Sequence, residues 1–245
     1  MARGLIIKDG VSLDEYIKLK GLRKEFILGE NIIKAVDGID LSIEKGEMLR
    51  ISGRSGSGKS TLLNLMAGLE KTTSGEIIID GKHIEKMNER ERIRYRRKNI
   101  GFIFQSYNLL PQYTALENVS LPLILRGLAP REREEMAKEI MEQVGIYSHR
   151  AHKPNEMSGG QQQRIGIARA LVTDPPIVFA DEPTGNLDTK TSEEVMELLL
   201  KLFMKKGTTF VLVSHDEGTR DYIEKTIYLE DGKIINSKLS KEEGH

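Results

Sequence analysis

The residues with the clearest chemical potential lie in one glycine-rich stretch, Gly53-Arg54-Ser55-Gly56-Ser57-Gly58-Lys59-Ser60-Thr61. Its three glycines allow the backbone to curl until its N–H groups converge on phosphate oxygens. Lys59 can reach the β- and γ-phosphates of a nucleotide, and Ser60 offers a hydroxyl to Mg²⁺. An apolar run precedes the stretch and a helical run follows it, so a helix N-terminus would add its positive end. The pattern predicts a phosphate-binding loop rather than a flexible glycine-serine linker.

Two carboxylates follow a second apolar run, Ile177-Val178-Phe179-Ala180-Asp181-Glu182. A strand that is buried on both faces and ends in carboxylates places them at the carboxyl edge of a sheet, where ligands bind. Asp181 would hold Mg²⁺ through water, and Glu182 would act as general base on the attacking water. Taken alone, this segment is better interpreted as a solvated acidic turn before Pro183, but the phosphate loop upstream favours the catalytic interpretation.

A third candidate site is Ser158-Gly159-Gly160-Gln161. Ser158 and Gln161 have capping-box spacing, which predicts that a helix begins here. Two glycines in its first turn leave backbone N–H groups open to an anion. An ordinary capped helix is the alternative.

The elements that must position these residues alternate along the chain. The first half is predicted to consist mainly of strands and turns, with strands at 16–22, 36–43 and 48–52 and hairpins whose two-residue turns are Asp80-Gly81 and Asp231-Gly232. A charged helical insert is expected over about 115–143. Helix, strand, helix and strand then follow at 165–171, 177–180, 192–203 and 209–213, which predicts an α/β fold with a parallel sheet.

Composition excludes several classes of function. The 37 basic and 37 acidic residues balance, so there is no electrostatic case for nucleic acid or for an anionic membrane surface. Cysteine is absent, which excludes disulfides and thiolate metal sites and is compatible with the cytoplasm. No signal peptide and no apolar run of about 18 residues is present, so work at a membrane would require docking on another subunit.

The motifs, in their order, resemble the nucleotide-binding subunit of an ABC transporter over nearly the whole chain. The phosphate loop, the signature Met157–Gln161 and the Asp181-Glu182 strand end match that family. Gln105 resembles its glutamine loop, Gly185-Asn186-Leu187-Asp188 its aspartate loop, and His215 its switch histidine. Other phosphate-loop enzymes share the first motif and the Asp181 strand, but not the rest.

The resemblance implies a phosphate-loop NTPase (RecA-like) core with an N-terminal antiparallel β subdomain and an inserted α-helical subdomain. It implies one ATP-binding domain, with the core at 1–105 and 160–245 and the helical subdomain at 106–159. It further implies a head-to-tail dimer, either of this chain or with a paralogous ATPase subunit, that holds two ATP molecules with Mg²⁺.

The family's roles fall on individual positions of this chain. Ser158, with Gly159, Gly160 and Gln161, would reach the γ-phosphate that the partner's Lys59 holds, and Asp188 would contact the partner's phosphate loop. Gln105 would join Ser60 and Asp181 at Mg²⁺, and His215 would grip the γ-phosphate or orient the water with Glu182. Phe26 stands where the family has a tyrosine that stacks on adenine, and it keeps the aromatic face. Arg54 is a departure at a position that is often proline, and Met157 replaces a leucine with similar volume.

Further sequence segments indicate which branch of the ABC transporter family the chain resembles. The segments at 100–105, 108–111, 114–119, 152–155 and 185–188 resemble ATPases of lipoprotein release and macrolide export. In that branch the ATPase drives a separate permease in the cell membrane, which implies a cytoplasmic protein held at the inner face of that membrane. No role is predicted for residues 1–15.

Three other functions compete with this interpretation. An ABC ATPase of chromosomes or ribosomes would carry a long coiled coil between its motifs or a second cassette, and neither is present in the sequence. A small-molecule kinase would leave Gln105, Ser158 and His215 without a function. A degenerate, non-hydrolysing subunit is disfavoured by the intact Lys59, Asp181, Glu182 and His215.

Overall fold

The computed structural model describes residues 7–8, 11–12, 15–215, 223 and 225–239. The chain divides into two compact units, which are described separately here: unit 1 comprises residues 1–92 and 215–245, and unit 2 comprises residues 93–214. Near the N-terminus, β1 (Ile7–Lys8) pairs antiparallel with β2 (Val11–Ser12).

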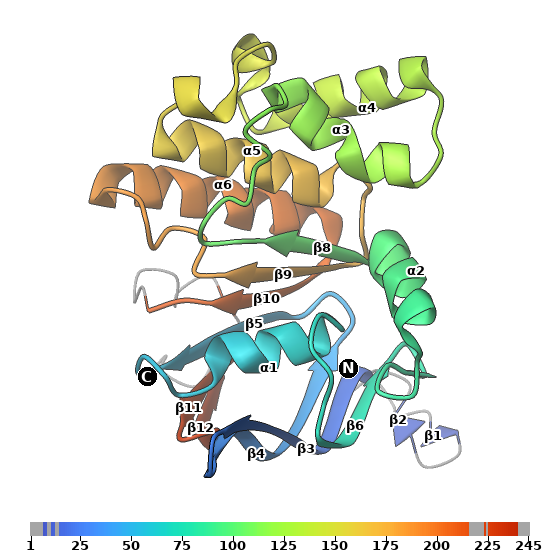
Figure 1. Cartoon of the computed structure of the whole chain (residues 1–245), viewed down its shortest axis with the longest axis vertical. Helices are drawn as coiled ribbons and strands as arrows, with labels where there is room; N and C mark the ends of the chain where they lie inside the picture. Colours follow the sequence, from blue (N-terminus) through green and yellow to red (C-terminus); the bar gives the residue numbers. More distant parts are fainter. Residues whose placement is uncertain (1–6, 9–10, 13–14, 216–222, 224, 240–245) are drawn as a thin grey trace, which may run out of the picture. The chain divides into compact units, whose positions relative to one another are not determined.

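Unit 1 contains an antiparallel sheet in the order β4-β3-β6-β7 (Figure 1). Its two long strands are β3 (Glu15–Leu28) and β4 (Asn31–Glu44), and β6 (Ser74–Ile79) and β7 (Lys82–His83) complete it. Both alternating segments expected from the sequence lie inside the long strands. Their apolar side chains are buried because alternate residues of a strand point to one face, here Ile17, Leu19, Leu22, Val36, Ile39, Leu41 and Ile43.

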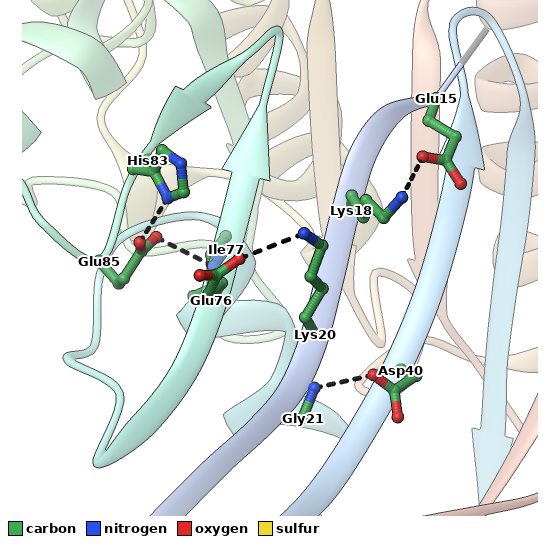
Figure 2. Close-up of polar contacts among 9 residues, drawn as sticks. All are labelled: Glu15, Lys18, Lys20, Gly21, Asp40, Glu76, Ile77, His83 and Glu85. Atoms are coloured by element: carbon green, nitrogen blue, oxygen red, sulfur yellow. Dashed lines mark hydrogen bonds and ion pairs between the residues drawn. The ribbon is translucent and has the colours of Figure 1, made fainter. Parts of the chain in front are cut away.

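Polar side chains make hydrogen bonds and ion pairs along the strands of this sheet (Figure 2). The β3 strand bulges between Leu19 and Leu22, where the carboxylate of Asp40 accepts the backbone N–H of Gly21 at 2.8 Å. On the neighbouring strand pair, Glu85 accepts the backbone N–H of Ile77 at 3.0 Å with one oxygen. Its other oxygen lies 2.7 Å from the ring of His83.

A parallel strand pair carries the phosphate loop of unit 1. It consists of β5 (Met48–Gly53), which leads to helix α1 (Lys59–Met66), and of β11 (Lys225–Glu230), which runs parallel to β5. Strand β12 (Lys233–Leu239) pairs antiparallel with β11. The predicted two-residue turns are confirmed: both residues have positive φ in Asp80-Gly81 and in Asp231-Gly232, as hairpin turns require.

Unit 2 is built on three parallel strands in the order β10-β9-β8. They are β8 (Ile100–Ile103), β9 (Ile177–Asp181) and β10 (Thr209–Val213). The pairing is parallel on both sides of β9, and its residues 177–180 are buried, as their continuous apolar character predicts. The α/β class with parallel strands is thus confirmed.

Helices α3 (Ala115–Leu125), α4 (Pro130–Gln143), α5 (Gly159–Leu171) and α6 (Thr189–Lys206) complete most of unit 2. Helix α5 packs against α3, α4, α6 and β8 (Figure 1). The helical insert is confirmed, but it consists of two helices that separate at Gly127, where φ is +80°, and Pro130 opens the second. Short 3₁₀ helices η1 (Tyr147–His149) and η2 (Pro154–Glu156) lead towards α5.

The sequence analysis predicted no helix between the hairpin turn at Asp80-Gly81 and residue 100, but helix α2 (Glu89–Asn99) lies there. Its run of charged residues hides the apolar periodicity from which helices are recognised. A capping box forms instead at its start, where Asn88 and Glu91 exchange hydrogen bonds between side chain and backbone. Acidic residues in its first turn and basic residues in its last turn favour the helix dipole.

Among the described residues, no helix has the length and apolarity needed to cross a membrane.

Candidate functional site

The phosphate loop of unit 1 folds around the side chain of Lys59. This side chain is buried, and its ammonium donates to the backbone carbonyls of Gly53 at 3.0 Å and of Arg54 at 2.9 Å. The backbone N–H of Ser57 donates to the carbonyl of Arg54 at 3.2 Å and closes the turn. Lys59 is therefore held at the first residue of α1, with its charge directed at the loop that the sequence identified.

Gly58 shows why this loop requires glycine. Its φ of +100° is in the left-handed region, and a Cβ built on it would lie 2.1 Å from the backbone carbonyl oxygen of Ala35. Arg54, Ser55, Gly56 and Ser60 are exposed around it, and Thr61 is half-buried. The first turn of α1 carries no acidic side chain, so its positive end is available to an anion.

Phe26 lies near the tip of the β3–β4 hairpin in unit 1. Phe26 is 38% exposed, and the ammonium of Lys24 lies 4.8 Å from the centroid of its ring. Lys24 in turn pairs with Glu70 at 2.7 Å. An accessible aromatic face fits the predicted stacking on a base.

In unit 2, the predicted metal ligand Asp181 and the predicted general base Glu182 lie at the end of the central strand. Asp181 is the last residue of β9 and Glu182 follows it, both half-buried. Glu182 has φ of +43°, uncommon for a residue with a side chain, and its backbone N–H donates to the carbonyl of Val213 at 3.0 Å. This strand-to-loop change fixes the direction in which the Glu182 side chain leaves the sheet.

The predicted helix start at Ser158 is confirmed. Ser158 is the N-cap of α5, its hydroxyl accepts the backbone N–H of Gln161 at 3.3 Å, and Gln161 accepts the backbone N–H of Ser158 at 2.9 Å. Ser158 is exposed, Gly159 and Gly160 are half-exposed, and the first turn again lacks acidic residues. The arrangement offers a second helix N-terminus that suits an anion.

The glutamine and aspartate loops of unit 2 contact each other. The side-chain amide of Asn186 donates to the backbone carbonyl of Gln105 at 3.0 Å. Asp188 is the N-cap of α6, and its carboxylate accepts the hydroxyl of Thr191 at 2.6 Å and the backbone N–H of Thr191 at 3.1 Å. These hydrogen bonds, led by the hydroxyl, hold the pKa of Asp188 below its usual range. Asp188 is therefore an anion at neutral pH.

His215 follows the buried strand β10 after Ser214 and is exposed. His215 belongs to unit 1 together with the phosphate loop. Within unit 1, then, Lys59 contacts the phosphate loop. Within unit 2, Gln105 contacts the aspartate loop through Asn186.

Sequence reasoning missed Arg169, which stabilises the segment after Gln105. Its guanidinium donates to the carbonyls of Tyr107 at 2.8 Å and Asn108 at 2.6 Å, and both of these residues have positive φ. Burial lowers the pKa of Arg169 from its usual value. The sequence signal that could have identified Arg169 is its position as the one charged residue within the apolar run 165–171, because a charge in such a run is buried only when it has partners.

The family profile that matches this chain is that of the ABC transporters, over residues 36–185. A relative in Methanocaldococcus jannaschii, described as the uncharacterized ABC transporter ATP-binding protein MJ0796, is 47% identical over 222 residues, covering 89% of this chain and 94% of its own. The lipoprotein-releasing system ATP-binding protein LolD of Bacteroides thetaiotaomicron is 44% identical over 218 residues, covering 89% of this chain and 98% of its own.

A solved structure is similar over most of the chain. The dimeric structure of a post-hydrolysis state of the ATP-binding cassette MJ0796, bound to ADP and Pi, matches with a TM-score of 0.86 and 44% identity, covering 91% of this chain and 98% of that one. It confirms the predicted fold class.

Proposed function

Because the chain belongs to the ATP-binding subunits of ABC transporters and is an ATPase of that family, we propose that it closes head-to-tail around two ATP molecules and drives a separate membrane subunit. The observation that carries the proposal is a pair of helix N-termini that lack acidic residues in their first turns and therefore suit an anion. Helix α1 begins at Lys59 beneath the phosphate loop, and α5 begins at the exposed Ser158. A chain with both ends can bind one nucleotide with its own loop and a partner's nucleotide with its signature.

In unit 1, the residues Gly53–Thr61 bind the phosphates. Lys59 supplies the positive charge, and the carbonyls of the loop hold its ammonium in place. Phe26 stacks on the base, and His215 contacts the γ-phosphate or the attacking water.

In unit 2, Glu182 acts as general base on the attacking water. Ser158 and Gly159–Gln161 bind the partner's γ-phosphate, and the anion Asp188 contacts the partner's phosphate loop. The rigid turn at Glu182 supports this role, since a base must be held within hydrogen-bond reach of the proton it removes.

The chemistry of the donor set tests whether Mg²⁺ fits. Ser60, Gln105 and Asp181 offer a hydroxyl, a carboxamide and a carboxylate, which are the hard oxygen donors that Mg²⁺ prefers. These residues would hold the ion, which when bound neutralises charge on the phosphates.

The names of the relatives indicate which kind of membrane partner the ATPase drives. LolD is named for a lipoprotein-releasing system. We propose that this chain belongs to the same branch, and that its partner is a permease that acts in lipoprotein release, export or mechanotransmission. The chain would then be cytoplasmic and peripheral on the inner face of the membrane. Co-purification with a four-helix permease that carries a large extracytoplasmic domain would support this extension.

The variant Glu182→Gln tests the catalytic assignment. It should still bind ATP, hydrolyse it at least ~100-fold more slowly and accumulate as a dimer, because its amide cannot accept the proton of water. Phosphate release and gel filtration with ATP measure both effects. Glu134→Gln, which removes an exposed carboxylate on α4, is the matched control and should resemble the wild type. A fully active Glu182→Gln would exclude the general base, and a monomer at saturating ATP would contradict closure.

A further inference from the structure

The signature motif has a hydrogen-bond neighbour outside the motif. The side-chain nitrogen Nε2 of Gln161 lies 3.0 Å from Nε2 of His149, which comes from η1. On the other side of the ring, Nδ1 of His149 lies 3.0 Å from the hydroxyl of Ser148. Both ring nitrogens of His149 are therefore engaged, one of them by the residue that closes the capping box of α5.

The capping box decides which way the Gln161 amide points. Its oxygen accepts the backbone N–H of Ser158, and a backbone N–H can only donate. The NH₂ group of Gln161 must therefore be the end that faces His149. An NH₂ group donates, so Nε2 of His149 has to accept, which requires a neutral imidazole with its proton on Nδ1.

We propose that His149 is a positioning residue for the signature: as a neutral imidazole it orients Gln161, and its protonation loosens the capping box at Ser158 and slows ATP hydrolysis. This inference rests on the proposed function of Ser158–Gln161 in nucleotide binding. A protonated ring puts an N–H against the NH₂ of Gln161. If the amide turns over to avoid this, its NH₂ faces the backbone N–H of Ser158 instead. Either arrangement sets two donors against each other.

The groups around His149 define its electrostatic surroundings. The ring of His152 lies 5.2 Å away, centroid to centroid, and it is a second imidazole. Two cations near η1 are engaged elsewhere, since the ammonium of Lys138 and the guanidinium of Arg150 lie over the ring of Tyr147.

On α5, the charged residue one turn beyond Gln161 is Arg164. Its guanidinium donates to the carbonyl of Val144 at 3.0 Å and lies 3.6 Å from the carboxylate of Glu194. Among the described contacts of His149, then, the only titratable partner is His152. A substitution of His152 therefore serves as the control.

Two substitutions of His149 separate its two nitrogens. In His149→Gln the side-chain oxygen can occupy the place of Nε2 and accept from Gln161 at every pH. In His149→Asn the shorter side chain replaces Nδ1 but leaves Gln161 without an acceptor. The two variants have similar polarity and no charge, so they differ in the hydrogen bond under test.

The experiment measures kcat/KM for ATP from pH 5.5 to 8 and divides each wild-type value by that of His149→Gln. The proposed catalytic His215 is common to both proteins, so its effect on the rate cancels in the ratio. We expect a ratio near one at pH 8 that falls roughly threefold to tenfold at pH 5.5, the fold-change of one net hydrogen bond. His149→Asn should be lower than wild type by a similar factor at pH 8.

The variant His152→Gln is the matched control, and its acid dependence should follow the wild type. A wild-type to His149→Gln ratio that stays constant with pH would overturn the proposal, as would a His149→Asn enzyme equal to wild type at pH 8. Equal thermal unfolding of the variants at pH 8 shows that the effect is not a loss of fold.

Nitrogen NMR of the histidine rings gives an answer that does not depend on activity. The His149 signals, identified by their absence in His149→Gln, should show the proton on Nδ1 at neutral pH. A proton on Nε2 would overturn the inference even in a fully active enzyme. A wild-type protein that does not hydrolyse ATP would contradict the proposed function instead, while the NMR result still decides the role of His149.

Discussion

The side-chain amide of Asn186 donates to the backbone carbonyl of Gln105 at 3.0 Å. The two residues are 81 positions apart, and the bond joins the glutamine loop to the aspartate loop within unit 2. The Gln105 side chain also passes close to Gly185, where an added Cβ would lie 2.7 Å from Nε2 of Gln105. The position of a proposed Mg²⁺ ligand therefore depends on the loop that we propose contacts the partner in the dimer.

Asn186→Leu removes this hydrogen bond while it keeps the size of the side chain. We expect the Mg²⁺ concentration for half-maximal ATPase activity to rise roughly threefold to tenfold, because the lost bond no longer holds the Gln105 backbone. Titration of activity with Mg²⁺ at saturating ATP measures this. Asn236→Leu, an exposed change on β12, is the control. An unchanged Mg²⁺ requirement would show that Asn186 does not position Gln105.

Arg169→Met should destabilise the protein. Two carbonyls in a left-handed turn lose a charged donor, so the free energy of unfolding should fall by about 3 kcal/mol. Urea denaturation measures the change. Arg169→Lys can restore one of the two bonds and should lie between wild type and Arg169→Met, whereas equal stability of all three would exclude this role.

Gly58→Ala should weaken nucleotide binding at least about tenfold, because the left-handed conformation alone costs roughly 1–2 kcal/mol and the Cβ also meets the Ala35 carbonyl. Gly56→Ala is the matched control: φ is +80° there, but nothing lies within 4 Å of its Cβ. Binding of a fluorescent ATP analogue compares them. Equal losses would show that the contact with Ala35 has no effect.

The contribution of Glu117 to the stability of the protein, at the start of α3, should depend on pH. Its carboxylate accepts the backbone N–H of Thr114 at 2.8 Å and its hydroxyl at 2.9 Å, and these bonds hold the pKa below 4.5. A carboxyl whose pKa is depressed on folding stabilises the protein above the unfolded pKa, and the contribution is lost as pH falls through the folded pKa. The stabilisation is thus complete above about pH 4.5 and is lost progressively as the pH falls from there through the folded pKa.

Carboxyl NMR titration measures this pKa directly. In Thr114→Ala, which removes the hydroxyl, the pKa of Glu117 should move up towards its ordinary value. A pKa that stays unchanged in Thr114→Ala would exclude the hydroxyl bond as a cause.

The local elements were predictable where one short-range interaction decides them. Ser158 and Gln161 are three residues apart, so their capping box follows from their spacing, and the Asp80-Gly81 turn follows from two residues that tolerate positive φ. Helix α2 was not predicted, because its many charged residues obscure the apolar periodicity from which a helix is recognised.

The sequence by itself determined the phosphate loop, the buried strand before Asp181 and the helix start at Ser158, since each depends on residue types within one segment. Only the tertiary structure showed that Asn186 holds Gln105, that Arg169 holds the turn after it, and that His149 faces Gln161. These hydrogen bonds join segments that are 81, 61 and 12 residues apart. Their geometry depends on how helices and loops pack in three dimensions, and no local pattern of residues encodes it.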